Sequence, residues 1–188
     1  MIIRVIGNGN SGAKTANIVL KEARKKESQV IYYYEYPPHD GVTFDHELTA
    51  VQTSKLNISN FEAQDLIISC GWAHKLQYEL VKNGNCYNIH PSLLPKYRGI
   101  MSIEKQFSDG VDISGITLHR MDMGYDTGPV FARVIYKITR LSEDEIVKTG
   151  MIALNKLICC FFQEYPNIHC VDQNDMDFES QVRSLVLF

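Results

Sequence analysis

The sequence predicts an α/β fold in which a doubly wound, mostly parallel sheet ends in an antiparallel element. Short apolar runs alternate with amphipathic segments through the first half of the chain, which is the pattern of βαβ units. Two β-like runs then follow each other directly, as antiparallel neighbours do. The chain has 188 residues, enough to bury a sizeable core. We therefore predict a single domain over residues 1–188.

The first half of the chain supplies the parallel strands of this prediction. One helix is expected over residues 13–26, because its apolar residues recur at the i, i+3, i+4 and i+7 positions from Ala16 onward. A second helical stretch is expected near residues 74–82, whereas residues 42–62 show no clear pattern. The apolar runs that predict strands are residues 2–6, 29–34, 65–70 and 85–89.

The second half of the chain predicts the antiparallel element and a covering helix. Residues 113–119 and 129–138 read as β structure. The capping-box pattern Ser142-Glu143-Asp144-Glu145 predicts the start of a long helix. Residues 166–188 begin with acidic residues and end with apolar ones, so we expect this tail to pack on the body of the protein.

Composition argues against several classes of partner. The formal net charge of −3 provides no basic surface for nucleic acid. No apolar run approaches the roughly 20 residues that span a bilayer, so we expect no membrane partner. The five cysteines show no CxxC spacing, which favours reduced thiols in a cytoplasmic protein. We predict no metal.

A glycine-rich loop follows the first predicted strand. Residues 7–12, Gly-Asn-Gly-Asn-Ser-Gly, fit G-x-G-x-x-G, and Glu35 follows the second predicted strand. This context is that of a dinucleotide-binding loop. Glycines at a helix N-terminus also form a nest for any phosphate, with Asn8, Asn10 and Ser11 as further donors. A bare tight turn is the third interpretation, and the loop alone does not decide which phosphate is bound.

The block that points most clearly to chemistry is residues 88–99, Asn-Ile-His-Pro-Ser-Leu-Leu-Pro-Lys-Tyr-Arg-Gly. Asn88 and His90 are two residues apart, so on a strand their side chains leave from the same face. Pro91 and Pro95 then exclude a regular helix or a central strand. Polar groups at a strand end, followed by a stiff loop, are typical of reaction sites in open α/β sheets.

A second loop supplies carboxylates. Asp122 and Asp126 lie between the two predicted antiparallel runs. A loop aspartate is more often a turn former than a catalytic group. Together with Asn88 and His90, however, Asp126 completes a base, an imidazole and an oxyanion donor, the set that acyl transfer requires.

These two motifs together resemble the 10-formyltetrahydrofolate-dependent formyltransferases. The resemblance rests on the block at 88–99, on Gly-Ile-Thr-Leu-His at 115–119 and on Asp-Thr-Gly-Pro at 126–129. It implies a formyltransferase (Rossmann-like) fold, and Asn88, His90 and Asp126 as the catalytic residues. The residues implied to bind the folate are Trp72, Ala73, His74, Leu76, Met121, Asp122, Met123, Gly124 and Tyr125. The residues expected to bind the acceptor are Gly7, Asn8, Gly9, Asn10, Ser11, Ser92 and Arg98.

The resemblance also implies a division of labour and a mechanism. Residues 1–64 would form the acceptor and phosphate side, residues 65–140 the catalytic and folate half, and residues 141–188 the C-terminal helix and tail. The Asn88 amide and a protonated His90 would stabilise the formyl oxygen, and Asp126 would hold His90 charged. His119 is either a supporting residue or a structural one.

The amine that accepts the formyl group is less well specified. We expect a nucleotide-linked amino sugar, since Gly71-Trp72-x-His74 resembles the sugar-modifying members of the family. Glycinamide ribonucleotide is the alternative acceptor. Further alternatives are a formyltetrahydrofolate hydrolase, and a non-catalytic or dinucleotide-binding module that uses the glycine loop. A homodimer is compatible with the sequence.

Overall fold

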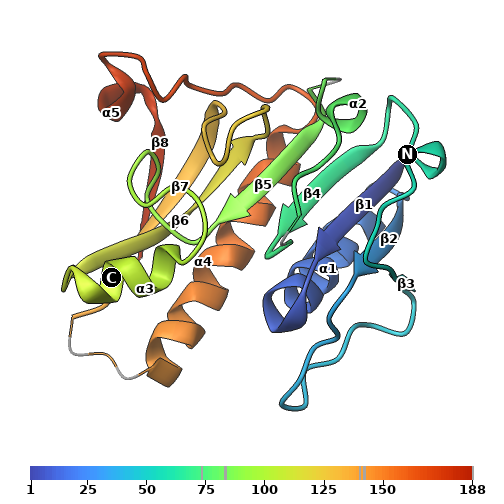
Figure 1. Ribbon diagram of the computed structural model, residues 1–188, viewed down its shortest axis with the longest axis horizontal. Coiled ribbons are helices and arrows are strands. Elements are labelled where there is room, and N and C mark those ends of the chain that lie inside the picture. The colour runs from blue at the N-terminus through green and yellow to red at the C-terminus, as the bar shows by residue number, and fades with distance from the viewer. Residues whose placement is uncertain (73, 83, 140, 142, 188) are drawn as a thin grey trace. The chain divides into compact units, whose positions relative to one another are not determined.

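The computed structural model describes residues 1–72, 74–82, 84–139, 141 and 143–187. It consists of two compact units, Met1–Asn88 and Ile89–Phe188, which are described in turn (Figure 1).

The first unit is built on a parallel sheet. Its strands are β1 (Ile2–Gly7), β2 (Gln29–Tyr34), β3 (Thr49–Gln52) and β4 (Leu66–Cys70), in the order β3-β2-β1-β4. Each neighbouring pair is parallel. Helix α1 (Gly9–Arg24) packs against β1 and β2 through its apolar face. Every residue of β4 is buried, as a continuous apolar run in a parallel sheet predicts.

Shorter elements complete this unit. They are the 3₁₀ helix η1 (Ile58–Asn60), the helix α2 (Tyr78–Val81) and the strand β5 (Cys86–His90), whose last two residues belong to the second unit. Two helix predictions need correction. The helix expected from residue 13 begins at Gly9, because the glycine-rich segment itself forms the first turn of α1. The helix expected over 74–82 is only the four residues of α2.

The second unit contains the antiparallel pair. Strands β6 (Ile113–Arg120) and β7 (Val130–Lys137) are antiparallel, and β8 (Arg183–Leu187) lies parallel to β7. Helix α4 (Glu143–Glu164) packs against β6 and β7. Helices α3 (Ser102–Ser108) and α5 (Phe178–Gln181) and strand β8 were not expected from the sequence.

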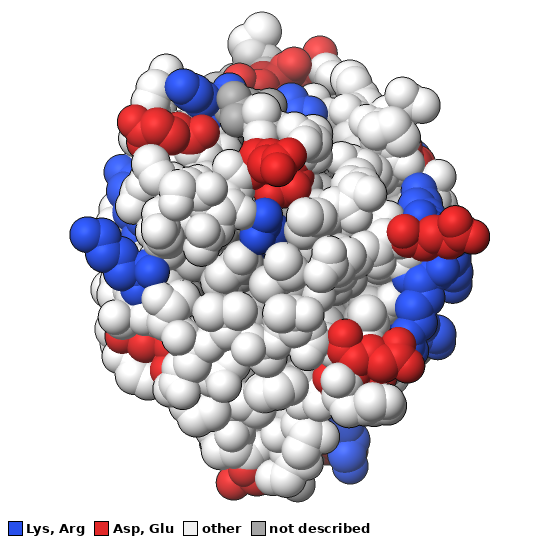
Figure 2. Space-filling view, turned by 90° about the vertical axis from the view of Figure 1, so that its right-hand side faces the viewer, with Lys and Arg blue, Asp and Glu red and all other residues white. Residues whose placement is uncertain are grey.

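The predicted fold class is confirmed: the sheet strands are mostly parallel, with an antiparallel pair near the C-terminal end. The predicted packing of the tail is also confirmed, since β8 pairs with β7. Ser142 of the predicted capping box and Phe188 of the tail lie outside the described residues. Within the described part of the chain, no helix is long and apolar enough to cross a membrane. Figure 2 shows acidic and basic side chains interspersed on the face that it presents.

Candidate active site

The imidazole of His90 lies at the end of β5, where Pro91 stops the strand. The residue is 5% exposed. Its Nε2 atom is 2.8 Å from the backbone carbonyl oxygen of Tyr97. A carbonyl oxygen can only accept, so this contact places a proton on Nε2. Asn88 is half-buried two residues earlier on the same strand, so its side chain leaves from the same face as His90.

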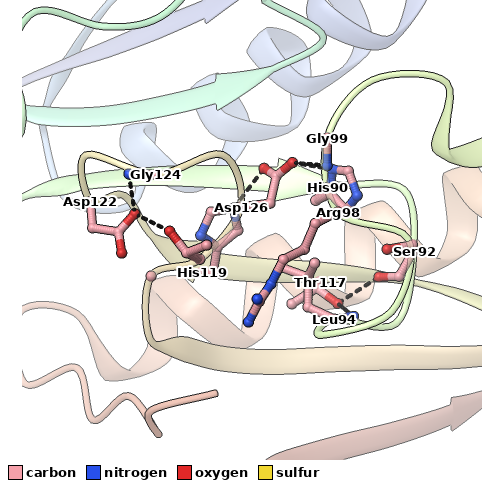
Figure 3. A network of polar contacts seen from close by, with 12 residues as sticks. His90, Ser92, Leu94, Arg98, Gly99, Thr117, His119, Asp122, Gly124 and Asp126 are labelled. Carbon is pink, nitrogen blue, oxygen red and sulfur yellow. Dashed lines mark hydrogen bonds and ion pairs between the residues drawn. The ribbon is translucent and has the colours of Figure 1, made fainter. Parts of the chain in front are cut away.

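The carboxylate of Asp126 lies between two imidazoles (Figure 3). Its Oδ2 atom is 3.3 Å from Nδ1 of His90, and its Oδ1 atom is 3.3 Å from Nε2 of His119. The backbone N–H of Gly99 donates to Oδ2 over 2.9 Å. The chain therefore brings together the predicted His90 and Asp126 and adds His119 as a second ring.

The protonation of this cluster is constrained by its contacts. Nδ1 of His119 is 3.0 Å from the carbonyl oxygen of Arg120. Both ring nitrogens of His90 and both of His119 thus face oxygen atoms. A neutral imidazole has only one N–H, so both contacts of one ring are donations only when that ring is charged. While a ring is neutral, it donates in only one of its two contacts.

Burial acts on the pKa of both partners. It raises the pKa of Asp126, but the hydrogen bond from His119, the charge of His90 and the Gly99 N–H outweigh it and lower the pKa to about 2. Burial lowers the pKa of His90, more than the Asp126 charge and the Tyr97 carbonyl raise it. Asp126 does favour the charged form of His90, as expected. Burial outweighs that effect, however, so the expectation of a net charged His90 is wrong: its pKa is lowered.

The loops around the carboxylate are held by side-chain hydrogen bonds. Asp122 Oδ1 accepts from the Gly124 N–H at 2.9 Å and from the Thr127 hydroxyl at 2.7 Å, so it closes its own turn. The hydroxyl of buried Ser92 donates to the Lys96 carbonyl oxygen, 2.8 Å away. Acceptor binding by Ser92, or folate binding through this oxygen of Asp122, would require these contacts to open.

The remaining predicted residues of the second unit differ in exposure. Met123 is 48% and Tyr125 62% exposed, whereas Met121 is half-buried. Arg98 is half-buried and donates to the side-chain oxygen of Gln173 from Nε at 3.0 Å and from Nη2 at 2.6 Å. Gln173 also donates to the backbone carbonyl oxygens of Asp126 and Gly128.

In the first unit, the glycine-rich turn uses its asparagines to bind its own backbone. Asn8 Oδ1 accepts from the N–H groups of Glu35 and Tyr36, at 2.8 and 3.0 Å. Asn10 Oδ1 accepts from the N–H of His39 at 2.9 Å. These contacts tie the turn to the segment after β2. They favour a structural use of the two amide oxygens, and phosphate binding by this turn stays a prediction.

Close packing explains the glycines of that turn. A Cβ on Gly7 would lie 2.3 Å from the Cys70 carbonyl oxygen, and one on Gly12 would lie 2.5 Å from the Gly7 carbonyl carbon. A Cβ on Gly71 would lie 3.2 Å from the Ser11 hydroxyl oxygen. The turn and the segment after β4, which the sequence assigned to different substrates, are therefore adjacent. Gly9 has φ +56°, a conformation that favours glycine.

The segment after β4 borders a pocket of about 190 Å³. His74 Nε2 is 2.7 Å from a carboxylate oxygen of Glu35, and the Trp72 ring meets the His74 ring edge-on at 5.4 Å. In a dinucleotide-binding protein, an acidic residue at this position would bind the ribose. Here the Glu35 carboxylate is paired with the His74 imidazole. Ala73 lies outside the described residues. The pocket is lined by Ser54, Lys55, Leu56, Trp72, His74, Lys75, Leu76, Gln77 and Leu80.

Sequence reasoning missed two groups that hold the Asp126 loop, the Gly99 N–H and Gln173, and left the role of His119 open. The Gly99 N–H is a backbone group, which residue type does not reveal. The pairing of His119 with Asp126 could have been suspected, because His119 ends a β run just before the Asp126 loop. Gln173 lies 47 residues beyond Asp126, and no sequence motif connects them.

The fold is α/β, and its site holds a half-buried carboxylate between two imidazoles, with the Asn88 amide on the same strand as His90. Such a site is suited to acid–base chemistry at a carbonyl group. The chain belongs to the formyl transferase family, whose model matches residues 6–152.

Curated relatives include two kinds of formyltransferase. Phosphoribosylglycinamide formyltransferase of Bacillus subtilis is 36% identical over 95 residues, which are 50% of this chain and 47% of the relative. Methionyl-tRNA formyltransferase of Nitratiruptor is 33% identical over 118 residues, 61% of this chain and 38% of the relative. The chain thus spans less than half the length of these relatives.

Solved structures share the fold at low sequence identity. The phosphoribosylglycinamide formyltransferase of Bacillus halodurans gives a TM-score of 0.69 at 18% identity, over 89% of this chain and 97% of that one. An N-formyltransferase of Helicobacter canadensis, in complex with folinic acid and dTDP-3-aminofucose, gives 0.69 at 22% identity, over 98% of this chain and 71% of that one.

Proposed function

We propose that the protein is an N-formyltransferase that moves a formyl group from 10-formyltetrahydrofolate to the primary amine of a small phosphorylated acceptor, a nucleotide-linked amino sugar. The observation that carries the proposal is the Asp126 carboxylate held between His90 and His119. Family membership supports the type of reaction.

The side chains near this carboxylate match the charges that formyl transfer generates. 10-Formyltetrahydrofolate supplies the formyl carbonyl, whose oxygen gains negative charge when an amine attacks. The Asn88 amide would donate to that oxygen, and one such donor contributes about 10²–10³ in rate in comparable sites. A His90 ring with a lowered pKa is ready to accept the proton that the amine loses, and Asp126 stabilises the imidazolium that results. The bond between the formyl carbon and N10 of the folate then breaks, and the proton passes to N10, the leaving nitrogen.

His90 must release one contact before it can act on a substrate. Its Nε2 contact with the Tyr97 carbonyl oxygen is 2.8 Å long, and its Nδ1 contact with Asp126 is longer, at 3.3 Å. The Nδ1 contact is the one to open, because a neutral ring with its proton on Nε2 has no hydrogen on Nδ1 to donate to Asp126. His119 keeps Asp126 paired through its other oxygen while that happens.

The pocket of the first unit suits the ring system of a folate. Trp72 and Leu76 line the pocket of about 190 Å³ with aromatic and apolar surface, and His74 adds a polar edge. Planar heteroaromatic rings bind in such surroundings. Met123 and Tyr125 expose apolar side chains on a short loop, where a ring system would shield them from water.

The acceptor assignment rests on finer features. Trp72 and His74, in the order seen here, resemble the sugar-modifying members of the family, and we place the acceptor and its phosphate with residues 1–64. Glycinamide ribonucleotide is the second candidate, favoured by the 36% identity to the Bacillus subtilis relative.

The proposal is tested by incubating the protein with 10-formyltetrahydrofolate and separate acceptors. The panel contains a dTDP-linked amino sugar, glycinamide ribonucleotide, and water alone. Mass spectrometry follows the gain of one carbonyl group on each amine, and absorbance follows loss of the formyl donor. We expect the amino sugar to be formylated, and Asp126→Asn to slow the reaction by about 10²–10⁴-fold.

Each other outcome selects an alternative. Product with glycinamide ribonucleotide alone would move the protein to the second acceptor, and donor loss without product would make it a hydrolase. No turnover with saturable NADH binding, read by fluorescence, would favour the dinucleotide-binding module. No turnover and no binding of either folate or NADH would refute the proposal.

A further inference from the structure

The side chain of Gln173 joins three segments of the second unit. It lies between α4 and α5 and is 6% exposed. Its Nε2 donates to the carbonyl oxygens of Asp126 and Gly128, at 3.0 and 2.7 Å. Its Oε1 accepts from Nε and Nη2 of Arg98. A glutamine amide has two N–H groups and two lone pairs, so all four of its hydrogen-bonding positions are used.

The segment that carries Gln173 is itself anchored. Two residues earlier, Val171 exchanges two backbone hydrogen bonds with Val130, each 2.8 Å long. Both valines belong to a buried apolar cluster with Leu94 and Phe178. Gln173 is therefore presented from a packed segment, and Val130 begins the strand that directly follows the Asp126 loop.

The loop that Gln173 holds has an unfavourable backbone. Asp126 has φ +56°, in the left-handed region that residues with a Cβ disfavour. At Gly128, a Cβ would lie 2.0 Å from the carbonyl oxygen of Arg120. Gln173 donates hydrogen bonds to the carbonyls of both residues. These bonds hold the loop in a conformation that the backbone of Asp126 does not favour by itself.

We propose that Gln173 is a positioning residue, which fixes the Asp126 carboxylate against His90 by holding the Asp126 and Gly128 carbonyls and the Arg98 guanidinium on one amide. The consequence for turnover rests on the proposed formyl transfer, whereas the placement of the carboxylate does not. Because Gln173 touches neither ring, its effect on the reaction is indirect.

The first test measures carboxylate placement without activity. NMR titration of the histidine ring nitrogens gives the pKa of His90, which faces the charged or titratable groups Asp126 and His119. The charge of Asp126 raises that pKa, so releasing the carboxylate in Gln173→Ala is expected to move the His90 titration to lower pH. Gln163→Ala, an exposed change on α4, is the matched control and should leave it unmoved.

The second test uses kinetics of the active protein. A displaced catalytic group slows the chemical step, and a misplacement of about 1 Å costs roughly 10²-fold in rate. We expect Gln173→Ala to lower kcat by about 10²-fold with little change in KM for the folate. Gln173→Glu keeps the acceptor for Arg98 but loses both donors, so it should show the same loss in kcat.

The outcomes separate this proposal from the proposed function. An inactive wild-type protein with a shifted His90 titration in Gln173→Ala would refute formyl transfer and keep the positioning role. The positioning role would be overturned if Gln173→Ala left the His90 titration midpoint where it is in the wild-type protein and kept kcat within twofold of the wild-type value. If neither variant folds, the wild-type Gln173 amide protons decide: exchange as fast as that of an exposed glutamine overturns the proposal, and slow exchange supports it.

Discussion

Asp65 of the first unit and Asp126 of the second are both shielded from water, yet they are held by different kinds of partner. Asp65 is 4% exposed and pairs with Nε of Arg4 at 2.5 Å. The Arg4 guanidinium is in turn bound by the Tyr33 hydroxyl at 2.6 Å and lies over the Phe61 ring. Asp126 is instead held by two imidazoles and one N–H.

The difference teaches what each carboxylate can do. A guanidinium stays charged at every ordinary pH, so the Arg4–Asp65 pair cannot exchange protons and serves the fold. An imidazole changes its charge near neutral pH, so the Asp126 cluster can take up and release a proton. Removing Asp126 should therefore cost activity, and removing Asp65 should cost stability.

The largest expected effect is on turnover when Asp126 becomes asparagine. Asp126→Asn keeps the size of the side chain but removes the charge that stabilises an imidazolium on His90. Loss of acid–base assistance lowers rates by about 10²–10⁴-fold. We expect kcat for formyl transfer to fall by a factor near the upper end of this range. Asp175→Asn, a change at an exposed site, is the control and should keep the wild-type rate. Equal rates for the two variants would mean that Asp126, like Asp65, does not take part in the reaction.

The matching change in the first unit is Asp65→Asn. It leaves the Arg4 guanidinium buried without a counter-charge, and breaking a buried ion pair costs about 3–5 kcal/mol of unfolding free energy. Urea denaturation should show this loss, whereas the specific activity of the folded fraction stays near wild type. Asp40→Asn, at an exposed site, is the control. A large fall in kcat would assign Asp65 to the reaction.

The third change, Asn88→Ala, sharpens the comparison because Asn88 shares a strand face with His90. Loss of a donor to the formyl oxygen should lower kcat by about 10²–10³-fold and leave folate binding nearly unchanged. Steady-state kinetics with a fluorescence measurement of folate affinity separates the two quantities. The exposed Asn167→Ala is the control, and a variant that loses only folate affinity would contradict the assigned role.

The smallest effect is the acid dependence of stability. The folded-state pKa of Asp126 is about 2, below its ordinary value of 3.8, so the folded protein binds this proton less readily than the unfolded chain. The stabilisation is present above about pH 4 and is lost as the pH falls toward 2. Its size, reduced by solvent screening, is roughly 1–2 kcal/mol.

Denaturation at a series of pH values checks this dependence. Lowering the pKa of His90 acts in the same direction, because an unfolded chain takes up that proton first as the pH falls below its ordinary pKa. In Asp126→Asn the loss between pH 4 and 2 should be smaller than in the wild-type protein. An unchanged acid slope would mean that Asp126 is not held by charge.

Strands β1, β2 and β4 could be predicted because apolar runs mark them directly, whereas β3 and β8 were not expected. β2 has the predicted bounds, and β1 and β4 differ from prediction by one residue at one end. Helix α3 was missed because Ile103 and Phe107 of this helix are exposed, so its apolar residues do not mark a buried face. The start of α1 was placed late, because glycines were interpreted as a loop.

The candidate site was predictable where its residues are close in sequence or share a motif. Asn88 and His90 follow from strand alternation, and the motif at Asp126 supplied the third residue. Contacts such as His119 to Asp126, or Gln173 to its loop, depend on how β6, β7 and the C-terminal segment fold together. A single sequence does not contain that information in any local pattern.

The distance along the chain between Gln173 and its loop has a consequence for biosynthesis. The two hydrogen bonds that Gln173 donates reach back 47 and 45 residues, to Asp126 and Gly128. A nascent chain that has not yet extended past residue 173 therefore carries the Asp126 loop without these two hydrogen bonds. The placement of the Asp126 carboxylate therefore depends on a residue that is synthesised well after the loop itself.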